Sequence, residues 1–343
     1  MIHIYSSREA DHWDRIVQSF SQYDVYYLSG YVKAFQIHGD GDPYLLYYEG
    51  AALRAIYVYM KRPTALEGVY DSITPYGYGG VLFEGETTED KLRAFWEEYI
   101  DLMAQEHVVD NFVRYHPVLE NAVPMKVVSN VTDLGKTIAF DLASPEVIWE
   151  NIISKNRNMI RKAEKNGIVI EHGKGMELLD EFMHIYNATM EKDKAEEYYF
   201  FKRPFYESIH NDLRDNYEVF YARYDNKIIA ASIMIFANDR MNYHLSGSVT
   251  EYRNLAPSNL LLYKAALWGH EQGFKTFHLG GGVGSGMDGL YKFKAAFNKN
   301  SDYQFSIGRE IFDQVTYDQL VDIRRKTDPD FDDQSSFFPR YRA

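Results

Sequence analysis

The sequence predicts an α/β protein made of two domains that share one order of elements. The chain has 343 residues, and a single globular domain commonly spans about 100–200. Residues 44–60 and 219–235 show the same pattern of strand, acidic turn and strand, and each is followed by a further strand, a long helix and another strand. This repetition indicates an internal duplication. We expect a first domain at 1–140 and a second domain, with a C-terminal tail, at 141–343.

The expected elements follow from hydrophobic periodicity and from turn and cap residues. Thr88 is a suitable N-cap for one helix, and Gly273 is a typical stop for another. The first half should contain a strand at 2–6, helices at 8–20 and 28–37, a hairpin at 43–62, a helix at 87–107 and a strand at 111–117. The second half should contain helices at 146–166 and 176–195, three strands within 218–248, a helix at 258–272, a strand at 275–281 and a helix at 288–297.

The composition is that of a soluble globular protein, with 45% hydrophobic and 25% charged residues. No window approaches the roughly 18 uncharged apolar residues of a membrane span. The first residues, MIHIYSSREADHW, place acidic side chains where a signal peptide has basic and apolar ones. The chain has no cysteine, which excludes disulfides, thiolate metal sites and cysteine nucleophiles. We expect a cytoplasmic protein without a metal site.

The charge is strongly acidic overall but contains one basic segment. The net charge of −13 argues against a protein that coats nucleic acid without specificity, because that function needs clustered Lys and Arg. Residues 154–165, however, carry five basic side chains and one acidic one. Arg157, Arg161 and Lys165 follow at i, i+4 and i+8, so they share one helix face. This face either is simply solvated or contacts phosphates.

A glycine-rich loop at 284–289 fits the pattern G-x-G-x-x-G, with Glu310 about 20 residues further on, as in a dinucleotide fingerprint. A doubly wound sheet needs several more βα units after such a loop, and only 33 residues follow Glu310. We therefore interpret the segment as a glycine loop beside an active site, whose backbone amides suit an anionic group. His244 and His278 lie on expected strands and are interpreted as structural histidines.

Lys294 lies one turn into the helix that follows this loop. A fixed cation at that place can stabilise the negative charge that develops on a carbonyl oxygen under attack. Phe293 and Phe297 are spaced i, i+4 and are expected to pack inward.

Several segments of the chain together form a recognisable set. They are SITPYGYGG in the first half, and KNRNMIRKAEKNG, IYNATMEK, NYHLSGS, RNLAPSNLL, FHLGGG, LYKFKAAFN and the ending FFPRYRA in the second. Together they resemble the Fem family of peptidoglycan interpeptide-bridge aminoacyltransferases, densely over residues 140–343 and more loosely over the first 130. The resemblance implies two tandem GNAT-like domains, each a mixed sheet flanked by helices. Some members carry a coiled-coil arm; this chain has no heptad stretch and is similar to the arm-less members.

The resemblance also implies an activity and its partners. Family members take an amino acid from aminoacyl-tRNA and transfer it to an amine on the stem peptide of a peptidoglycan precursor, either lipid-linked or UDP-linked. The charged tRNA is a co-substrate, and no cofactor is expected. A lipid-linked acceptor would bring the enzyme to the inner face of the membrane. No obligate protein partner is evident.

The family's functional residues can be carried over by motif. Phe293 and Lys294 match the pair that stabilises the tetrahedral transition state, Lys33 is the nearest counterpart of a phosphate-contacting lysine, and Arg203 is the candidate for its partner arginine. The remaining substrate-binding candidates are Tyr76, Tyr78, Tyr199 and Tyr243. The candidate tRNA contacts are Lys155, Arg157, Arg161, Lys162 and Lys165.

One feature of the sequence separates two kinds of acyl donor. GNAT proteins that use acetyl-CoA hold its pyrophosphate with Q/R-x-x-G-x-G/A, and the matching run here is residues 253–258. Ala256 replaces the first glycine of that pattern, and Pro257 has no amide hydrogen to donate. An aminoacyl ester needs no such loop. The alternatives are an N-acyltransferase that uses acyl-CoA on a small amine, and a non-catalytic module that binds a wall precursor or tRNA.

Overall fold

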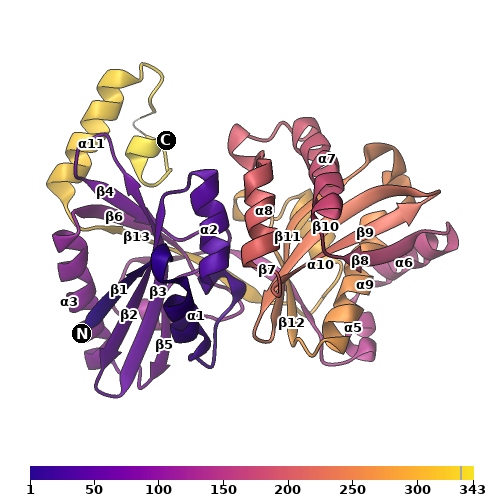
Figure 1. The fold of residues 1–343 in the computed structure, drawn as a ribbon, viewed down its shortest axis with the longest axis horizontal. Coiled ribbons are helices and arrows are strands. Elements are labelled where there is room, and N and C mark those ends of the chain that lie inside the picture. Colours follow the sequence, from indigo (N-terminus) through magenta and orange to yellow (C-terminus); the bar gives the residue numbers. More distant parts are fainter. Residues whose placement is uncertain (333) are drawn as a thin grey trace. The chain divides into compact units, whose positions relative to one another are not determined.

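A computed structural model describes residues 1–332 and 334–343 of the chain, which form two compact units (Figure 1). Unit 1 comprises residues 1–134 and 305–343, and unit 2 comprises residues 135–304. This division differs from the expected boundary at residue 140, because the last 39 residues belong to the first unit and not to the second.

Unit 1 contains a mixed sheet whose strands lie in the order β1-β2-β3-β4-β6-β13. Neighbours are antiparallel, except that β4 and β6 are parallel. The strands are β1 (Ile2–Ser6), β2 (Asp42–Gly50), β3 (Leu53–Pro63), β4 (Tyr70–Ile73), β6 (Val108–Arg114) and β13 (Tyr303–Ile311), with β5 (Leu82–Gly85) paired to β3. The helices are α1 (Ala10–Gln18), α2 (Ser29–His38), α3 (Glu89–Gln105), α4 (Ala122–Met125) and α11 (Gln314–Thr327).

Unit 2 repeats this arrangement with the strand order β8-β9-β10-β11-β12-β7. Again only one neighbouring pair, β11 and β12, is parallel. The strands are β7 (Val131–Asp141), β8 (Val169–Gly173), β9 (Tyr217–Tyr224), β10 (Lys227–Ala237), β11 (Arg240–Ser248) and β12 (Thr276–Gly280). The helices are α5 (Pro145–Asn151), α6 (Ser154–Lys165), α7 (Met176–Lys192), α8 (Arg203–Asp212), α9 (Pro257–Glu271) and α10 (Gly289–Ala295).

The two units therefore have the same topology, and the predicted duplication is confirmed. In each, three antiparallel strands precede a fourth, a helix (α3 or α9) connects the parallel pair, and a sixth strand closes the sheet. That sixth strand is out of sequence order in both units. Unit 1 takes it from β13, near the end of the chain, and unit 2 takes it from β7, which precedes all its other elements.

Most expected elements are present, but the helix predicted at 146–166 is wrong as a single element. It is interrupted between α5 and α6, because Ile152 and Ile153 are extended, with ψ angles of 130° and 150°. Thr88 precedes α3 as its N-cap residue, and Gly273, with φ of +85°, follows the end of α9. None of the described helices has the length and apolar character needed to cross a membrane.

The many tyrosines act as core residues with a polar end. In unit 1, Tyr57 donates to the Asn111 carbonyl at 2.9 Å, and the Asn111 amide donates to Tyr99 at the same distance. Burial of such large rings is favourable only when their hydroxyls find partners.

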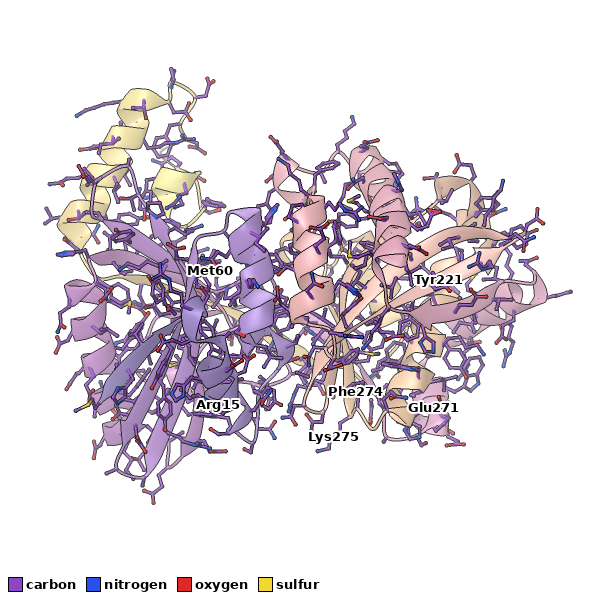
Figure 2. The ribbon with its side chains drawn as sticks, in the orientation of Figure 1. Arg15, Met60, Tyr221, Glu271, Phe274 and Lys275 are labelled. Carbon is purple, nitrogen blue, oxygen red and sulfur yellow. The ribbon has the colours of Figure 1, made fainter. Side chains whose placement is uncertain are left out.

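In unit 2, Phe274 lies in the turn after α9 and packs against Phe236 with ring centroids 5.1 Å apart. Lys275 follows it, directly before β12 (Figure 2).

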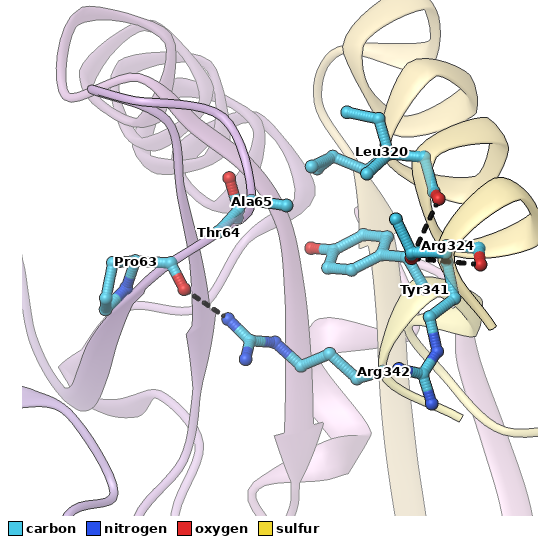
Figure 3. A pocket seen from close by; sticks show the side chains of 9 residues that line it. Pro63, Thr64, Ala65, Leu320, Arg324, Tyr341 and Arg342 are labelled. Carbon is cyan, nitrogen blue, oxygen red and sulfur yellow. Dashed lines mark hydrogen bonds between the residues drawn. The ribbon is translucent and has the colours of Figure 1, made fainter.

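The C-terminal segment is anchored in unit 1 by a buried polar cluster. The Tyr341 hydroxyl is hydrogen bonded to the carboxyl groups of two aspartates, Asp71 at 3.1 Å and Asp110. Asp71 also accepts from Arg62 Nε at 2.6 Å and from Arg342 Nε. A cavity of about 230 Å³ lies beside this cluster, between the end of β3, α11 and the C-terminal residues (Figure 3).

A count of hydrogens assigns the charges in this cluster. One hydroxyl hydrogen cannot serve two carboxylates. Asp71 has two guanidinium partners, so it is the ionised member, and it accepts from Tyr341. The contact between Tyr341 and Asp110 then needs a proton on Asp110. Burial raises the pKa of Asp110 to about 7; the hydrogen bond with Tyr341 opposes this change, and the Asp71 charge adds to it.

This assignment predicts a pH-dependent stability. An unfolded aspartate has a pKa of about 3.9, so at intermediate pH the folded state holds a proton that the unfolded state has released. The stabilisation linked to that proton is complete below about pH 4 and is lost as the pH rises through about 7. We expect wild type to lose on the order of 2 kcal/mol relative to Asp110→Asn between pH 5 and pH 8, measured by urea unfolding.

Asp322→Asn is the matched control, because Asp322 is an exposed member of an ion pair on α11. Its free energy of unfolding should follow that of wild type across this range. If Asp110→Asn also runs parallel to wild type, Asp110 is not the protonated member of the cluster.

Candidate active site

The candidate active site lies in unit 2, where β11 and β12 part. Their parallel register covers three pairs and ends at Asn242 and His278. β11 continues for six more residues to Ser248, while β12 ends at Gly280. Parallel strands that stop pairing leave backbone groups and side chains at their carboxyl ends for a ligand, which is the general position of binding sites in open α/β sheets.

A β-bulge on β11 lies directly after the last of these pairs. On the other edge of β11, Ile233 pairs with Leu245 and Met234 pairs with Tyr243, so His244 is an extra residue. Bulges redirect side chains and are frequent beside active sites. Burial lowers the pKa of His244 to about 3, so this imidazole is neutral. His278, the other histidine interpreted as structural, is buried and lies with Nε2 2.9 Å from Thr137 Oγ1.

On the side of β12, the chain turns sharply through Gly280, Gly281 and Gly282 into α10. A Cβ atom on Gly282 would lie 2.2 Å from the Gly286 carbonyl oxygen and 2.4 Å from Asp288 Oδ1, so no other residue fits there. Asp288 is the N-cap of α10 and accepts from the Tyr291 amide at 2.8 Å. Asp288 therefore fixes the start of this helix.

Lys294 is the buried cation of this site. Its side chain extends from α10 back to the end of β12, where Nζ donates to the Gly281 carbonyl at 2.8 Å. The residue is 9% exposed. Burial lowers the pKa of Lys294 to about 8, and the Asp288 carboxylate opposes that change. The ammonium is thus charged at neutral pH, but it loses its proton at a lower pH than an exposed lysine does.

The neighbours of Lys294 on α10 are less buried than Lys294, as their helix positions predict. Lys292 is exposed. Phe293 is half-buried and packs edge-on against Phe297, with ring centroids 5.3 Å apart. The Gly loop before α10 does not leave all its amides for an external anion, since Asp288 accepts from Val283 N at 3.3 Å as well as from Tyr291 N.

Residues 253–258, which correspond in sequence to the loop that holds CoA in GNAT proteins, have a different form here. Residues 250–255 form a 3-10 turn, and Ala256 has left-handed backbone angles that glycine adopts at less cost. The Ala256 amide donates to the Arg253 carbonyl at 3.1 Å, and the residue is 2% exposed. Pro257 begins α9 and has no amide hydrogen. Two of the backbone donors of such a loop are therefore missing or already used.

In unit 1 the equivalent place is closed by backbone pairing. After β4, the Thr74 amide donates to Phe112, and the Gly79 amide donates to Arg114 at 2.7 Å, so the segment stays attached to β6. Tyr76 and Tyr78, two of the substrate-binding candidates, belong to this segment. Tyr76 stacks on Phe35 of α2 at 5.3 Å between ring centroids, and Tyr78 lies edge-on to Tyr26 at 5.8 Å.

The other substrate-binding candidates lie on separate elements. Lys33 is exposed on α2 of unit 1. In unit 2, Tyr199 is half-buried beside Tyr198, and Tyr243 is half-buried and donates to Ser246 Oγ at 2.6 Å. Arg203 binds Asp180 and Glu207 through its guanidinium, at 2.5 and 3.0 Å. It would have to leave these carboxylates before it could bind a phosphate.

The five tRNA-contact candidates all lie on α6. Lys155, Arg161, Lys162 and Lys165 are exposed and Arg157 is half-buried. Ile160 and Ala163, on the opposite side of α6, are buried in unit 2, as the amphipathic pattern predicts. Sequence reasoning missed two residues that matter here. Asp288 has a local signal, because an aspartate before a helix is a typical N-cap. Trp149, which contacts two of the arginines, has none.

Part of unit 2 matches a known protein family. Residues 153–294, which lie wholly in unit 2 and end at Lys294, match the family model described as Acetyltransferase (GNAT) domain. No curated protein matches the chain. Among the described residues, no group of three His, Asp or Glu side chains is arranged to hold a metal ion.

Solved structures similar to this chain share its fold at low sequence identity. The crystal structure of FemX covers 93% of this chain and 99% of its own, at 15% identity and a TM-score of 0.68. A domain named for lysylphosphatidylglycerol synthetase, from Agrobacterium fabrum, covers 89% and 92%, at 16% identity and a TM-score of 0.60. A tandem GNAT protein from the clavulanic acid biosynthesis pathway covers 91% and 99%, at 8% identity and a TM-score of 0.50. The chain therefore has the tandem GNAT fold of FemX, and most of unit 2 matches the GNAT acetyltransferase domain model.

Proposed function

We propose that this chain transfers an amino acid from aminoacyl-tRNA to an amine on the stem peptide of a peptidoglycan precursor. The observation that carries the proposal is Lys294, a buried cation at the end of β12 in the acyltransferase domain. The acceptor is inferred from the Fem-like segments of the sequence, and it is lipid-linked or UDP-linked. The reaction needs no cofactor and no metal.

The chemistry asks for orientation and for oxyanion stabilisation. The amine nitrogen attacks the carbonyl carbon of the aminoacyl ester, a C–N bond forms, and the carbonyl oxygen becomes negative. The carbonyl then re-forms as the C–O bond to the tRNA ribose breaks, and the ribose oxygen leaves with the proton that the attacking nitrogen loses, so the products are an amide and a ribose hydroxyl. Because the ester is already activated, no nucleophilic side chain is required.

Lys294 suits the oxyanion role. Only a group that interacts more strongly with the oxyanion than with the ground-state carbonyl raises the rate. Nζ donates to a neutral carbonyl, Gly281 O. A charged oxygen is a stronger partner for an ammonium than a carbonyl is, so the ammonium gains interaction as the charge develops. Phe293, the preceding residue, is half-buried against Phe297.

The donor assignment is supported by two features of unit 2. The loop at 253–258 has lost backbone donors that would hold the pyrophosphate of CoA. The basic face of α6 provides five cations for a polyanionic donor. An acyl-CoA N-acyltransferase stays the second candidate, because the family model that matches is described as an acetyltransferase domain.

One experiment tests the function. The protein is incubated with a pool of charged tRNA and with lipid-linked or UDP-linked precursor in separate arms, and the precursor is examined for the mass of an added amino acid. Parallel arms replace charged tRNA with acetyl-CoA, or precursor with phosphatidylglycerol vesicles. Mass addition only in an arm with acetyl-CoA would replace the proposal by the second candidate, and no transfer in any arm would favour the non-catalytic module.

The role of Lys294 gives a prediction for a pair of variants. Lys294→Met keeps the length of the side chain and removes the charge, so it should fold, bind precursor and lose about a hundredfold to a thousandfold in kcat. Lys292→Met, two positions away on an exposed face, should stay near wild type. The measurement is steady-state transfer with both variants, with thermal unfolding as the check on folding. Equal effects of the two substitutions would contradict the assignment.

Asp288 should tune the pH dependence of the same step. The Lys294 ammonium is needed in its charged form, so the rate should fall as the pH rises through about 8. Asp288→Asn keeps the N-cap but removes the carboxylate that favours the ammonium. We expect the alkaline limb of kcat/KM to move down by roughly half a unit to one unit of pH.

The control for this variant is Asp302→Asn, which removes an exposed carboxylate of unit 2 that is paired with Lys136. Its pH profile should coincide with that of wild type. If Asp288→Asn leaves the alkaline limb of the kcat/KM profile at the wild-type pH, the deprotonation of Lys294 does not determine that limb.

A further inference from the structure

Five basic side chains form one face of α6: Lys155, Arg157, Arg161, Lys162 and Lys165. Among the residues that the structure describes, none of these five cations forms an ion pair, and Glu164 on the same helix pairs with Lys264 of α9 instead. Other cations of the chain bind a carboxylate, as Arg223 does with Glu171 at 3.0 Å. In a chain of net charge −13, this cluster of cations is available to an anion from outside the chain.

Two of these cations are held in place by an aromatic ring. Trp149 lies on α5, and its ring centroid is 5.9 Å from the Arg157 guanidinium carbon and 5.1 Å from that of Arg161. Arg157 Nη1 also donates to the Trp149 carbonyl at 3.3 Å. The ring is itself fixed, since it packs against Tyr263 of α9 with centroids 5.1 Å apart. The interruption between α5 and α6 makes this arrangement possible, because it allows the arginines of α6 to lie beside the Trp149 ring of α5.

The geometry fits two neighbouring phosphates. Residues at i and i+4 on a helix have Cβ atoms about 5–6 Å apart, so the two guanidinium groups form a short row. Each presents planar donors that match phosphate oxygens. A side chain already held by a ring loses less freedom on binding than a free one. A tryptophan between two arginines therefore favours binding without touching the ligand.

We propose that Arg157 and Arg161 form a clamp for two successive phosphates of an RNA backbone, and that Trp149 is the positioning residue of this clamp. The inference rests on the proposed function, in which the RNA is the tRNA donor. An anionic membrane surface fits less well. An amphipathic helix at a membrane needs an apolar face to enter it, and Ile160 and Ala163 of α6 are buried in unit 2.

The test uses the full chain and uncharged total tRNA, with binding measured between 50 and 200 mM salt, a range over which phosphate contacts weaken markedly. Trp149→Leu should weaken binding by about threefold to tenfold, while Trp149→Phe, which keeps a ring, should restore most of it. The double variant Arg157→Glu/Arg161→Glu should bind more weakly still, and its salt slope should be smaller by about two. Arg93→Glu, on an exposed face of α3 in unit 1, is the control and should not change the affinity.

A kinetic readout separates positioning from a merely structural role. In the transfer assay, Trp149→Leu should raise the KM for charged tRNA by a factor similar to the loss in affinity and leave kcat unchanged, since Trp149 is not part of the Lys294 site. If Trp149→Leu acted by destabilising the fold, the active fraction of the protein would fall, and the apparent kcat would fall with it. In that case Trp149→Phe would restore the affinity for tRNA only if it also restored the thermal stability.

The outcomes distinguish this inference from the proposed function. If wild type binds tRNA and transfers the amino acid, but Trp149→Leu binds with unchanged affinity, the positioning role is overturned and the function stands. If the arginine variant also binds unchanged, the clamp is overturned. If wild type binds no tRNA and binds vesicles of anionic phospholipid through Arg157 and Arg161, both the clamp for RNA and the proposed donor are wrong.

Discussion

The site depends on the short parallel pairing of β11 with β12. Because the register stops after three pairs, the facing edges of the two strands separate, while β11 stays paired with β10 and β12 stays paired with β7. Beyond this point β11 has a bulge at His244, and β12 is followed by a run of glycines that precedes α10. Asp288 lies at the start of that helix, and Lys294 Nζ donates to the Gly281 carbonyl at the end of β12.

The duplication shows what happens when the same topology keeps its pairing. In unit 1, the segment after β4 remains hydrogen bonded to β6 through Thr74 and Gly79. The short helix α4 follows β6 with the sequence AVPM, and the lysine at its C-cap, Lys126, is exposed and pairs with Asp133, unlike the buried Lys294. The proposed catalytic lysine therefore belongs to unit 2.

The sequence was a good guide wherever the signal is local. Periodicity and caps located the hairpins, α3 and α9, and they placed Lys294 in the helix that follows a glycine loop, where the structure has it. It failed where contacts are remote. The domain boundaries differ from the expected ones because β13 joins the sheet of unit 1 and β7 joins the sheet of unit 2. The sequence of a strand does not indicate which sheet it joins. Tyr341 meets Asp110 across 231 positions, and Trp149 meets its arginines only because Ile152 and Ile153 break a helix that periodicity predicts to continue.

The altered CoA loop and the basic helix are best understood together. An acyl donor needs an anchor outside the reacting carbonyl, since orientation is most of what aminolysis of an activated ester requires. In a GNAT protein that anchor is the amide-rich turn before the helix equivalent to α9. Here that turn is closed by Ala256 and Pro257. The helix that packs on α9 instead carries the unpaired cations: Asn259 of α9 donates to Asn156 of α6 at 2.7 Å, and Lys264 binds Glu164. The proposed anchor has thus moved from backbone amides to side chains one helix away, which suits a donor whose phosphates form a chain and not a single pyrophosphate.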